Sequence, residues 1–241
     1  MTADGLPAVA VQIGAGVLSA PEHRDWPPAR SYRDTIARIG RLCAASGITA
    51  QHELVGARAT RANVRATLAA SIAGLDPYGL LVLTFAGHSE RGPRDAGWCL
   101  YDGVLPLADV GNSLTALPGT AGAIVVADTC YAAALARFAK VSCTLVILAA
   151  CAEHQVMLDR PRTEFVERLE QAVSPGGRRN PDCVSYAWLK ERIQEATPDV
   201  ERPQVWTNRS AAWHLRPFEL LSTAHLQESR RRIPRRDASL S

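Results

Sequence analysis

The chain has 241 residues, of which 47% are hydrophobic and 21% charged, a composition that fits one domain with a buried core. It holds no run of roughly 20 apolar residues and no N-terminal secretion signal, so we expect a cytoplasmic protein with no membrane partner. Its net charge of +3 comes entirely from the tail "ESRRRIPRRDASLS", which leaves a neutral body and argues against a nucleic-acid partner.

The predicted elements alternate between strands and helices from the N-terminus onward. Apolar segments of strand length lie at 7–16, 48–56, 79–87, 121–129 and 143–151. Helical spacing of apolar residues is found at 32–47, 60–74, 107–119, 163–173 and 185–196, and strand-and-turn character at 97–107. The segments 87–97 and 174–182 are predicted loops. This alternation predicts an α/β fold with a mostly parallel sheet and helices on both faces.

Local signals mark the ends of the first two helices. Gly47 and Gly74 are expected to stop them, and Thr60 is expected to be the N-cap of the second. We expect a single domain over 1–218 and a basic, disordered tail over 219–241.

Chemically versatile side chains follow two of the predicted strands. "LLVLTFAGHSE" runs into His88 and Ser89, and "AIVVADTCYAA" runs into Asp128 and Cys130. Because strand ends of a parallel sheet meet at one edge, His88 and Cys130 are expected on the same rim if their strands are neighbours. There the imidazole can accept the thiol proton, and a helix starting after Cys130 would favour the thiolate. The backbone N–H groups of Cys130 and Ser89 could face the oxyanion of a tetrahedral intermediate.

A structural interpretation of the same residues stays open from the pattern alone. A cysteine after a strand is commonly a packed small residue, and an isolated histidine is commonly structural. A nucleotide-binding domain is less favoured, because no G-x-G-x-x-G or Walker loop follows a strand.

Five motifs in order resemble the caspase-like cysteine peptidases, and among them metacaspases and bacterial relatives more than animal caspases. "LLVLTFAGHSE" resembles the family strand ending in Ser-Gly-His-Gly, and "AIVVADTCYAA" the strand ending in Asp-Ser-Cys-x-Ser-Gly. "ATRANVRATLAASI", "WCLYDG" and "LVILAACAEHQ" are similar to the helix before the histidine, the segment after it and the strand after the cysteine. The resemblance covers about residues 8–210 and implies a caspase-like three-layer sandwich.

The resemblance also implies residue roles. His88 would be the general base and Cys130 the nucleophile of an endopeptidase acting on protein or peptide substrates. Asp128 would lie in the pocket for the side chain before the scissile bond, where a carboxylate favours Arg or Lys. Asp34 resembles a family aspartate that joins this pocket, although a plain helix-start role is the alternative.

The chain departs from the family pattern beside the dyad. Ser89 and Ala86 replace a glycine and a serine, and Ala132 and Ala133 replace the Ser-Gly after the cysteine. These changes weaken the expected preference for basic residues more than the expected chemistry. They also motivate the alternative of a catalytically inactive caspase-like module that binds a partner.

No metal or cofactor is expected. The six cysteines include no C-x-x-C pair, which argues against a zinc site and a disulfide framework. Asp95, Asp102 and Asp109 lack a convincing calcium-ligand spacing, so calcium dependence is left open.

Self-processing is a further expectation, because arginines lie in predicted loops. The candidate sites are Arg91, Arg94, Arg178 and Arg179. By analogy with similar stand-alone bacterial proteases, a partner protein encoded nearby is a candidate target in a defence or cell-death system.

Overall fold

A six-stranded sheet forms the centre of the molecule in a computed structural model that describes residues 8–92, 95–157, 164–173, 185–195 and 202–214. Across the sheet the strands are β2 (Ala50–Val55), β1 (Ala8–Ala15), β3 (Leu80–Gly87), β7 (Gly122–Asp128), β8 (Thr144–Ala149) and β9 (Gln204–Thr207). The first five are parallel, and β9 pairs antiparallel with β8. The predicted mostly parallel sheet is therefore confirmed, whereas β9 was not predicted.

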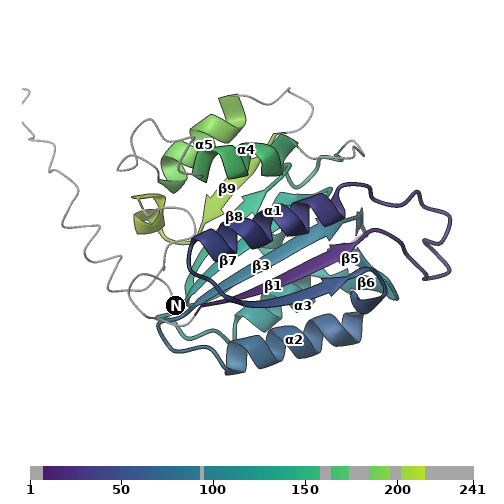
Figure 1. The fold of residues 1–241 in the computed structure, drawn as a ribbon, viewed down its shortest axis with the longest axis horizontal. Helices are drawn as coiled ribbons and strands as arrows, with labels where there is room; N and C mark the ends of the chain where they lie inside the picture. The colour runs from purple at the N-terminus through teal and green to yellow at the C-terminus, as the bar shows by residue number, and fades with distance from the viewer. Residues whose placement is uncertain (1–7, 93–94, 158–163, 174–184, 196–201, 215–241) are drawn as a thin grey trace, which may run out of the picture.

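Helices cover both faces of the sheet and make three layers (Figure 1). One face carries α1 (Tyr32–Ala45), α4 (Glu164–Val173) and α5 (Tyr186–Glu195), and the other carries α2 (Arg61–Ala73) and α3 (Leu107–Leu114). Short 3₁₀ helices are η1 (Gly56–Arg58), η2 (Ala132–Arg137) and η5 (Ser210–His214). This arrangement confirms the predicted α/β sandwich.

The core lies on both sides of the sheet because the central strands are apolar at most positions on both of their faces. In β3, Leu81 and Leu83 pack on the side of α2 and α3, while Leu80 and Val82 pack on the side of α1, α4 and α5. All four side chains are at most 1% exposed. A side-chain period of two in a strand covered on both faces explains this continuous apolar run.

The ends of the first two helices follow the predicted signals. The Thr60 side chain accepts a hydrogen bond of 3.2 Å from the backbone N–H of Asn63, as expected of an N-cap. Gly47 follows α1 with φ of 81°, a conformation that glycine adopts without a steric penalty.

A second, three-stranded antiparallel sheet extends from the end of β3. It consists of β4 (Ser89–Arg91), β5 (Ala96–Leu100) and β6 (Gly103–Pro106), in the order β4-β5-β6. Trp98 of β5 stacks on Phe85 of β3, with ring centroids 4.5 Å apart. The strand-and-turn prediction for 97–107 is confirmed. The loop predicted for 87–97 is partly wrong, because Ser89–Arg91 pairs with β5.

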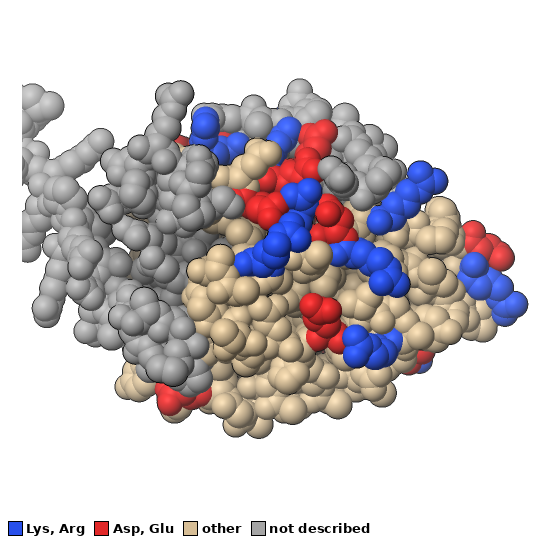
Figure 2. Space-filling model, viewed as in Figure 1, with Lys and Arg blue, Asp and Glu red and all other residues tan. Residues whose placement is uncertain are grey.

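Charged side chains of both signs are interspersed on the face that carries α1 and α4 (Figure 2). No helix among the described residues has the length and apolar character needed to cross a bilayer. The predicted domain boundary at 218 and the basic tail lie outside the described residues.

Candidate active site

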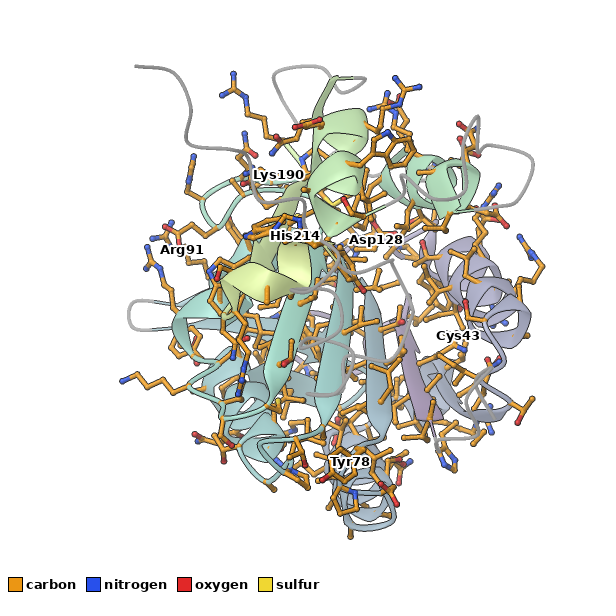
Figure 3. All side chains as sticks on the ribbon, turned by 90° about the vertical axis from the view of Figure 1, so that its left-hand side faces the viewer. Cys43, Tyr78, Arg91, Asp128, Lys190 and His214 are labelled. Carbon is orange, nitrogen blue, oxygen red and sulfur yellow. The ribbon has the colours of Figure 1, made fainter. Side chains whose placement is uncertain are left out.

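The strands that precede His88 and Cys130 are direct neighbours. Parallel pairing of β3 with β7 sets Ala86 opposite Asp128, and the two predicted catalytic residues each follow by two positions. Figure 3 shows Asp128 and Tyr78, which precedes β3, at opposite ends of the central strands. His88 and Cys130 therefore leave the sheet at the same carboxyl edge, as the sequence predicted.

A hydrogen bond joins the two segments beyond the strand ends. The Ser89 hydroxyl, on a residue that is 8% exposed, donates to the backbone carbonyl of Cys130. Ser89 follows His88 directly, so this bond fixes the backbone of the histidine segment against that of the cysteine segment. Its partner is a backbone carbonyl, so sequence patterns gave no signal for it.

Gly87 allows the chain to turn out of β3 toward His88. Its φ is 154°, and a Cβ atom there would lie 2.4 Å from the carbonyl oxygen of Ala15 on β1. That distance is far below van der Waals contact, so a side chain at this position would push β1 and β3 apart. This steric restriction explains why the residue before the histidine is glycine.

The ring of His88 is oriented by the loop between β1 and α1. Its Nε2 lies 2.7 Å from the carbonyl oxygen of Pro27, and the Trp26 ring meets it edge-on with centroids 5.6 Å apart. A carbonyl oxygen only accepts hydrogen bonds, so Nε2 carries the proton and, in the neutral ring, Nδ1 is the basic nitrogen. Sequence reasoning missed Trp26 and Pro27, since one acts through its backbone and neither lies in a recognisable motif.

The sulfur of Cys130 is half-buried and faces a backbone donor. The N–H of Met157 lies 3.3 Å from Sγ, a contact that favours negative charge on sulfur. By contrast, burial raises the pKa of Cys43 and Cys99 to about 12 and that of Cys143 to about 11. All three of these thiols are fully buried. They therefore lack the solvent access that a nucleophile needs.

The predicted helix start at Cys130 is wrong. Tyr131 adopts a left-handed conformation with φ of 54°, and only the 3₁₀ helix η2 follows. The N–H group of Tyr131 donates to the carbonyl of Gln155, and that of Ala133 donates to the carbonyl of Cys151. These N–H groups are therefore not free donors at the first turn of a helix. No helix dipole is therefore aimed at this sulfur, and the backbone donor that lies next to it is the N–H of Met157.

The loop after β8 supports the turn that carries Cys130. Gln155 accepts the Tyr131 N–H at 2.9 Å through its backbone, and its side-chain oxygen accepts from the N–H of Ala152 at 3.1 Å. The Cys151 thiol contacts the carbonyl of Thr129 at 3.3 Å. Through these bonds the segment "CAEHQ", which follows β8, holds the turn around Cys130 in place.

Asp128 lies at the end of β7 beneath this edge. Its side chain is 3% exposed, and Oδ2 accepts a hydrogen bond of 2.5 Å from the hydroxyl of Thr35 on α1. Two hollows lie along the small sheet and near η2, and neither is lined by Asp128, His88 or Cys130. A substrate side chain can therefore reach this carboxylate only if the side chains that cover it move.

Asp34 is engaged elsewhere. Its carboxylate accepts a 2.8 Å hydrogen bond from Arg38, whose guanidinium also contacts Glu167 and Glu170 of α4. The bond with Asp34, more than any other contact, raises the pKa of Arg38. The neighbouring Thr35, which sequence reasoning missed, is the α1 residue that contacts Asp128. The role of Asp34 in substrate binding stays a prediction.

The other aspartates considered for calcium have structural partners. Asp95 accepts from the N–H groups of Ala96 and Ala108. Asp102 and Asp109 pair with Arg61 and Arg65 of α2, at 3.6 and 2.6 Å. Each of these three carboxylates has its own protein partner, and calcium dependence stays open.

Of the four candidate self-cleavage sites, the structure describes Arg91 alone. It is exposed at the end of β4, where it pairs with Ala96. Arg94, Arg178 and Arg179 lie outside the described residues.

Comparison with known proteins supports the fold. No family model matches the chain, and no curated protein matches it significantly. The crystal structure of protein GSU0716 from Geobacter sulfurreducens, a structural genomics target, superposes with a TM-score of 0.75 at 18% sequence identity. The match covers 90% of this chain and 100% of that protein. At this identity the likeness concerns the α/β architecture alone.

Proposed function

We propose that the protein is a cysteine endopeptidase that uses Cys130 and His88 to cleave peptide bonds after arginine or lysine. The observation that carries the proposal is the pairing of β3 with β7, which delivers the two side chains to one edge of the sheet. The Ser89–Cys130 hydrogen bond and the Pro27 contact of His88 support it further.

The proposed reaction is acyl transfer through a thioester. Cys130 Sγ attacks the scissile carbonyl carbon while His88 Nδ1 takes the thiol proton, because Nε2–H is already bonded to Pro27. The resulting oxyanion would be met by the backbone N–H groups of Ser89 and Cys130. The imidazolium then protonates the leaving amine, and water hydrolyses the thioester with His88 again as base.

Specificity in this proposal comes from Asp128. A buried carboxylate two residues before the nucleophile is suited to a guanidinium or ammonium group, with which it can form charge-assisted hydrogen bonds. The Thr35 hydroxyl holds Oδ2 in place from α1. Asp34 is a second, more exposed carboxylate on the same helix, and its recruitment would require release from Arg38.

The test is cleavage of fluorogenic peptides ending in Arg, Lys or Asp by the purified full-length protein. We expect the unaltered protein to turn over the Arg and Lys peptides and Cys130→Ala to lose this activity. Cys143→Ala should keep it, because that change removes a fully buried thiol directly before β8. Asp128→Asn keeps the side-chain shape and should reduce turnover of basic peptides by about 10- to 100-fold. The matched control is Asp109→Asn on the surface of α3.

The possible results separate the two functions. Cleavage after aspartate would contradict the role of Asp128 while keeping the dyad. No cleavage and no labelling of Cys130 by a basic peptidyl electrophile would instead favour the inactive caspase-like module that binds a partner.

Self-cleavage and a partner target follow from the same site. An active chain that cuts itself at Arg91 or at the arginines outside the described residues would yield fragments absent from Cys130→Ala. Intact mass spectrometry of both proteins decides this point, and identical masses would exclude self-processing under those conditions. A protein encoded nearby in a bacterial defence system is the target class we propose to try first.

A further inference from the structure

A second group of side chains that can bind a metal ion lies outside the proposed dyad, on the β1–α1 loop and on the strands β4 and β5. His23 Nε2, a carboxylate oxygen of Glu90 and Cys99 Sγ all lie within 4.8 Å of one another. His23 is 3% exposed and Cys99 is fully buried. We propose that these three residues form a binding site for a divalent transition-metal ion of the zinc type.

The fold brings the three ligands together from separate segments. His23 comes from the loop between β1 and α1, Glu90 from β4 and Cys99 from the adjacent strand β5. No two of these three ligands lie close enough in the sequence to form a short metal-binding motif. The expectation of no metal site depended on local motifs such as C-x-x-C, which a site assembled from a loop and two strands does not contain.

The separations fit a metal ion after small side-chain movements. Ligand atoms about 2.0–2.3 Å from a tetrahedral zinc ion lie roughly 3.3–3.7 Å from one another. The His23–Glu90 pair is 2.8 Å apart and needs to open slightly, while every separation in the group is already within 4.8 Å. Glu90 is the adjustable ligand, because its side chain is 39% exposed.

The donor set selects the class of metal. One nitrogen, one sulfur and one oxygen suit a borderline ion such as Zn²⁺ or Co²⁺. Calcium and magnesium require oxygen ligands, so this cluster does not fit them. Three protein ligands leave a fourth position for water.

Surrounding groups support metal binding by His23. The carboxylate of Glu22 lies 3.9 Å from Nδ1, on the side of the ring opposite the cluster. At that distance Glu22 makes no hydrogen bond to Nδ1, which has no hydrogen-bond partner among the described residues, so Glu22 contributes only its negative charge beside the site. Glu22 and Glu90 are 59% and 39% exposed, which leaves a route for an ion from solvent.

Binding exchanges a proton for the metal ion. Burial, and next the charge of Glu90, raise the pKa of the Cys99 thiol to about 12, so the sulfur is protonated before binding. When the sulfur–metal bond forms, that proton passes to solvent and no group is oxidised or reduced.

The site is linked to the proposed dyad by short contacts. The N–H of Cys99 donates to the carbonyl of His88 at 3.0 Å, and Glu90 is two residues beyond His88. The His23 ring meets Trp26 edge-on at 4.7 Å, and Trp26 in turn contacts the ring of His88. A metal ion would therefore clamp the loop that orients His88. The binding itself does not depend on peptidase activity.

The test uses the full-length Cys130→Ala variant, so that the dyad cannot supply a thiol ligand of its own. Zinc is titrated against a chelating indicator, and cobalt is added as a spectroscopic probe. We expect one zinc per chain, a thiolate-to-cobalt absorption band, and a rise in Tm of roughly 5–10 °C when zinc exceeds Kd by 100-fold.

Variants made in this background locate the site. Cys99→Ala should abolish the cobalt band, and His23→Gln and Glu90→Gln should weaken zinc binding at least about 10-fold. The matched controls are His52→Gln, an exposed histidine of β2, and Cys143→Ala, a buried thiol elsewhere. Both controls should bind zinc as tightly as the parent.

Two results would overturn the proposal. One is the absence of stoichiometric zinc binding by the Cys130→Ala protein. The other is binding that survives unchanged in Cys99→Ala and Glu90→Gln. If Cys99→Ala fails to fold by circular dichroism, the partly exposed Glu90→Gln decides, and unchanged affinity in that variant overturns the proposal.

Discussion

The cysteine and histidine of the proposed dyad differ in their surroundings from the cysteine and histidine of the proposed metal site. Cys130 is half-buried beside a backbone N–H, and His88 is held by a backbone carbonyl. Cys99 is fully buried, and His23 is bonded to a carboxylate. The same two residue types thus suit nucleophilic chemistry in one setting and metal ligation in the other.

The charge of the neighbouring groups explains the difference. A backbone donor stabilises a thiolate without adding net charge, whereas a carboxylate next to a thiol opposes its ionisation unless a cation is present. The first setting suits the proposed attack on a carbonyl, and the second suits the proposed binding of a metal ion. Experiments that change or label the two pairs in the same way should therefore give effects of different size.

Histidine substitution should give the largest difference between the pairs. His88→Ala removes the proposed general base and should lower kcat for a basic peptide by about 10²- to 10⁴-fold. His23→Gln changes only the loop between β1 and α1, so it should lower kcat by roughly 10-fold or less. Steady-state kinetics of both variants, with His52→Ala as the exposed control, checks this. Equal losses at His88 and His23 would contradict the assignment of the base.

The sequence was sufficient for the strands that determine the fold. β1, β3, β7 and β8 are long apolar runs because helices cover both of their faces, so their composition reveals them. β9 was missed because it has four residues, lies at the edge and contains Gln204 and Thr207. A short edge strand has no distinctive composition, and its pairing depends on β8.

The candidate site divides in the same way. His88 and Cys130 were singled out because reactive side chains at strand ends leave a pattern, and Asp128 was singled out through the family resemblance; their roles stay predictions. Pro27 and Met157 were not found, because each contributes a backbone group that any residue has. Contact of Thr35 rather than Asp34 with Asp128 depends on the rotation of α1, which apolar spacing defines only to within about one residue.

Thiol alkylation should separate the two cysteines directly. A pKa of about 12 leaves about 10⁻⁵ of the Cys99 thiol ionised at pH 7, and its sulfur is buried. Iodoacetamide should therefore modify Cys130 at least about 100-fold faster than Cys99 or Cys43 in the native protein. Peptide mass spectrometry measures the rates, and labelling in urea provides the control in which the rates converge. Comparable native rates would mean that the two settings do not differ as described.

Loss of the Thr35 hydroxyl should have a smaller, substrate-dependent effect. Thr35→Val removes the hydrogen bond to Asp128 and should reduce kcat/KM for an arginine peptide by about 10- to 100-fold, mainly through KM. Thr35→Ser should restore most of the loss. Thr84→Val is the matched control, because that buried hydroxyl has no hydrogen-bond partner among the described residues. A fall in kcat alone, without rescue by serine, would argue against a role in substrate binding.

The smallest expected effect is the alkaline pH dependence of stability that the buried thiols create. In the folded protein the pKa of Cys43 is raised from 9.0 to about 12, so its contribution is complete below pH 9 and is lost as the pH rises toward 12. By pH 10 this amounts to about 1 kcal/mol for one such thiol, or a fall in Tm of roughly 2–4 °C. Cys43→Ala should reduce the difference in Tm between pH 8 and pH 10, measured by calorimetry. Leu68→Ala, a buried change without a titratable group, should lower Tm equally at both pH values. An unchanged pH difference in Cys43→Ala would show that this thiol ionises as readily in the folded chain as in the unfolded one, and burial would then not separate it from Cys130.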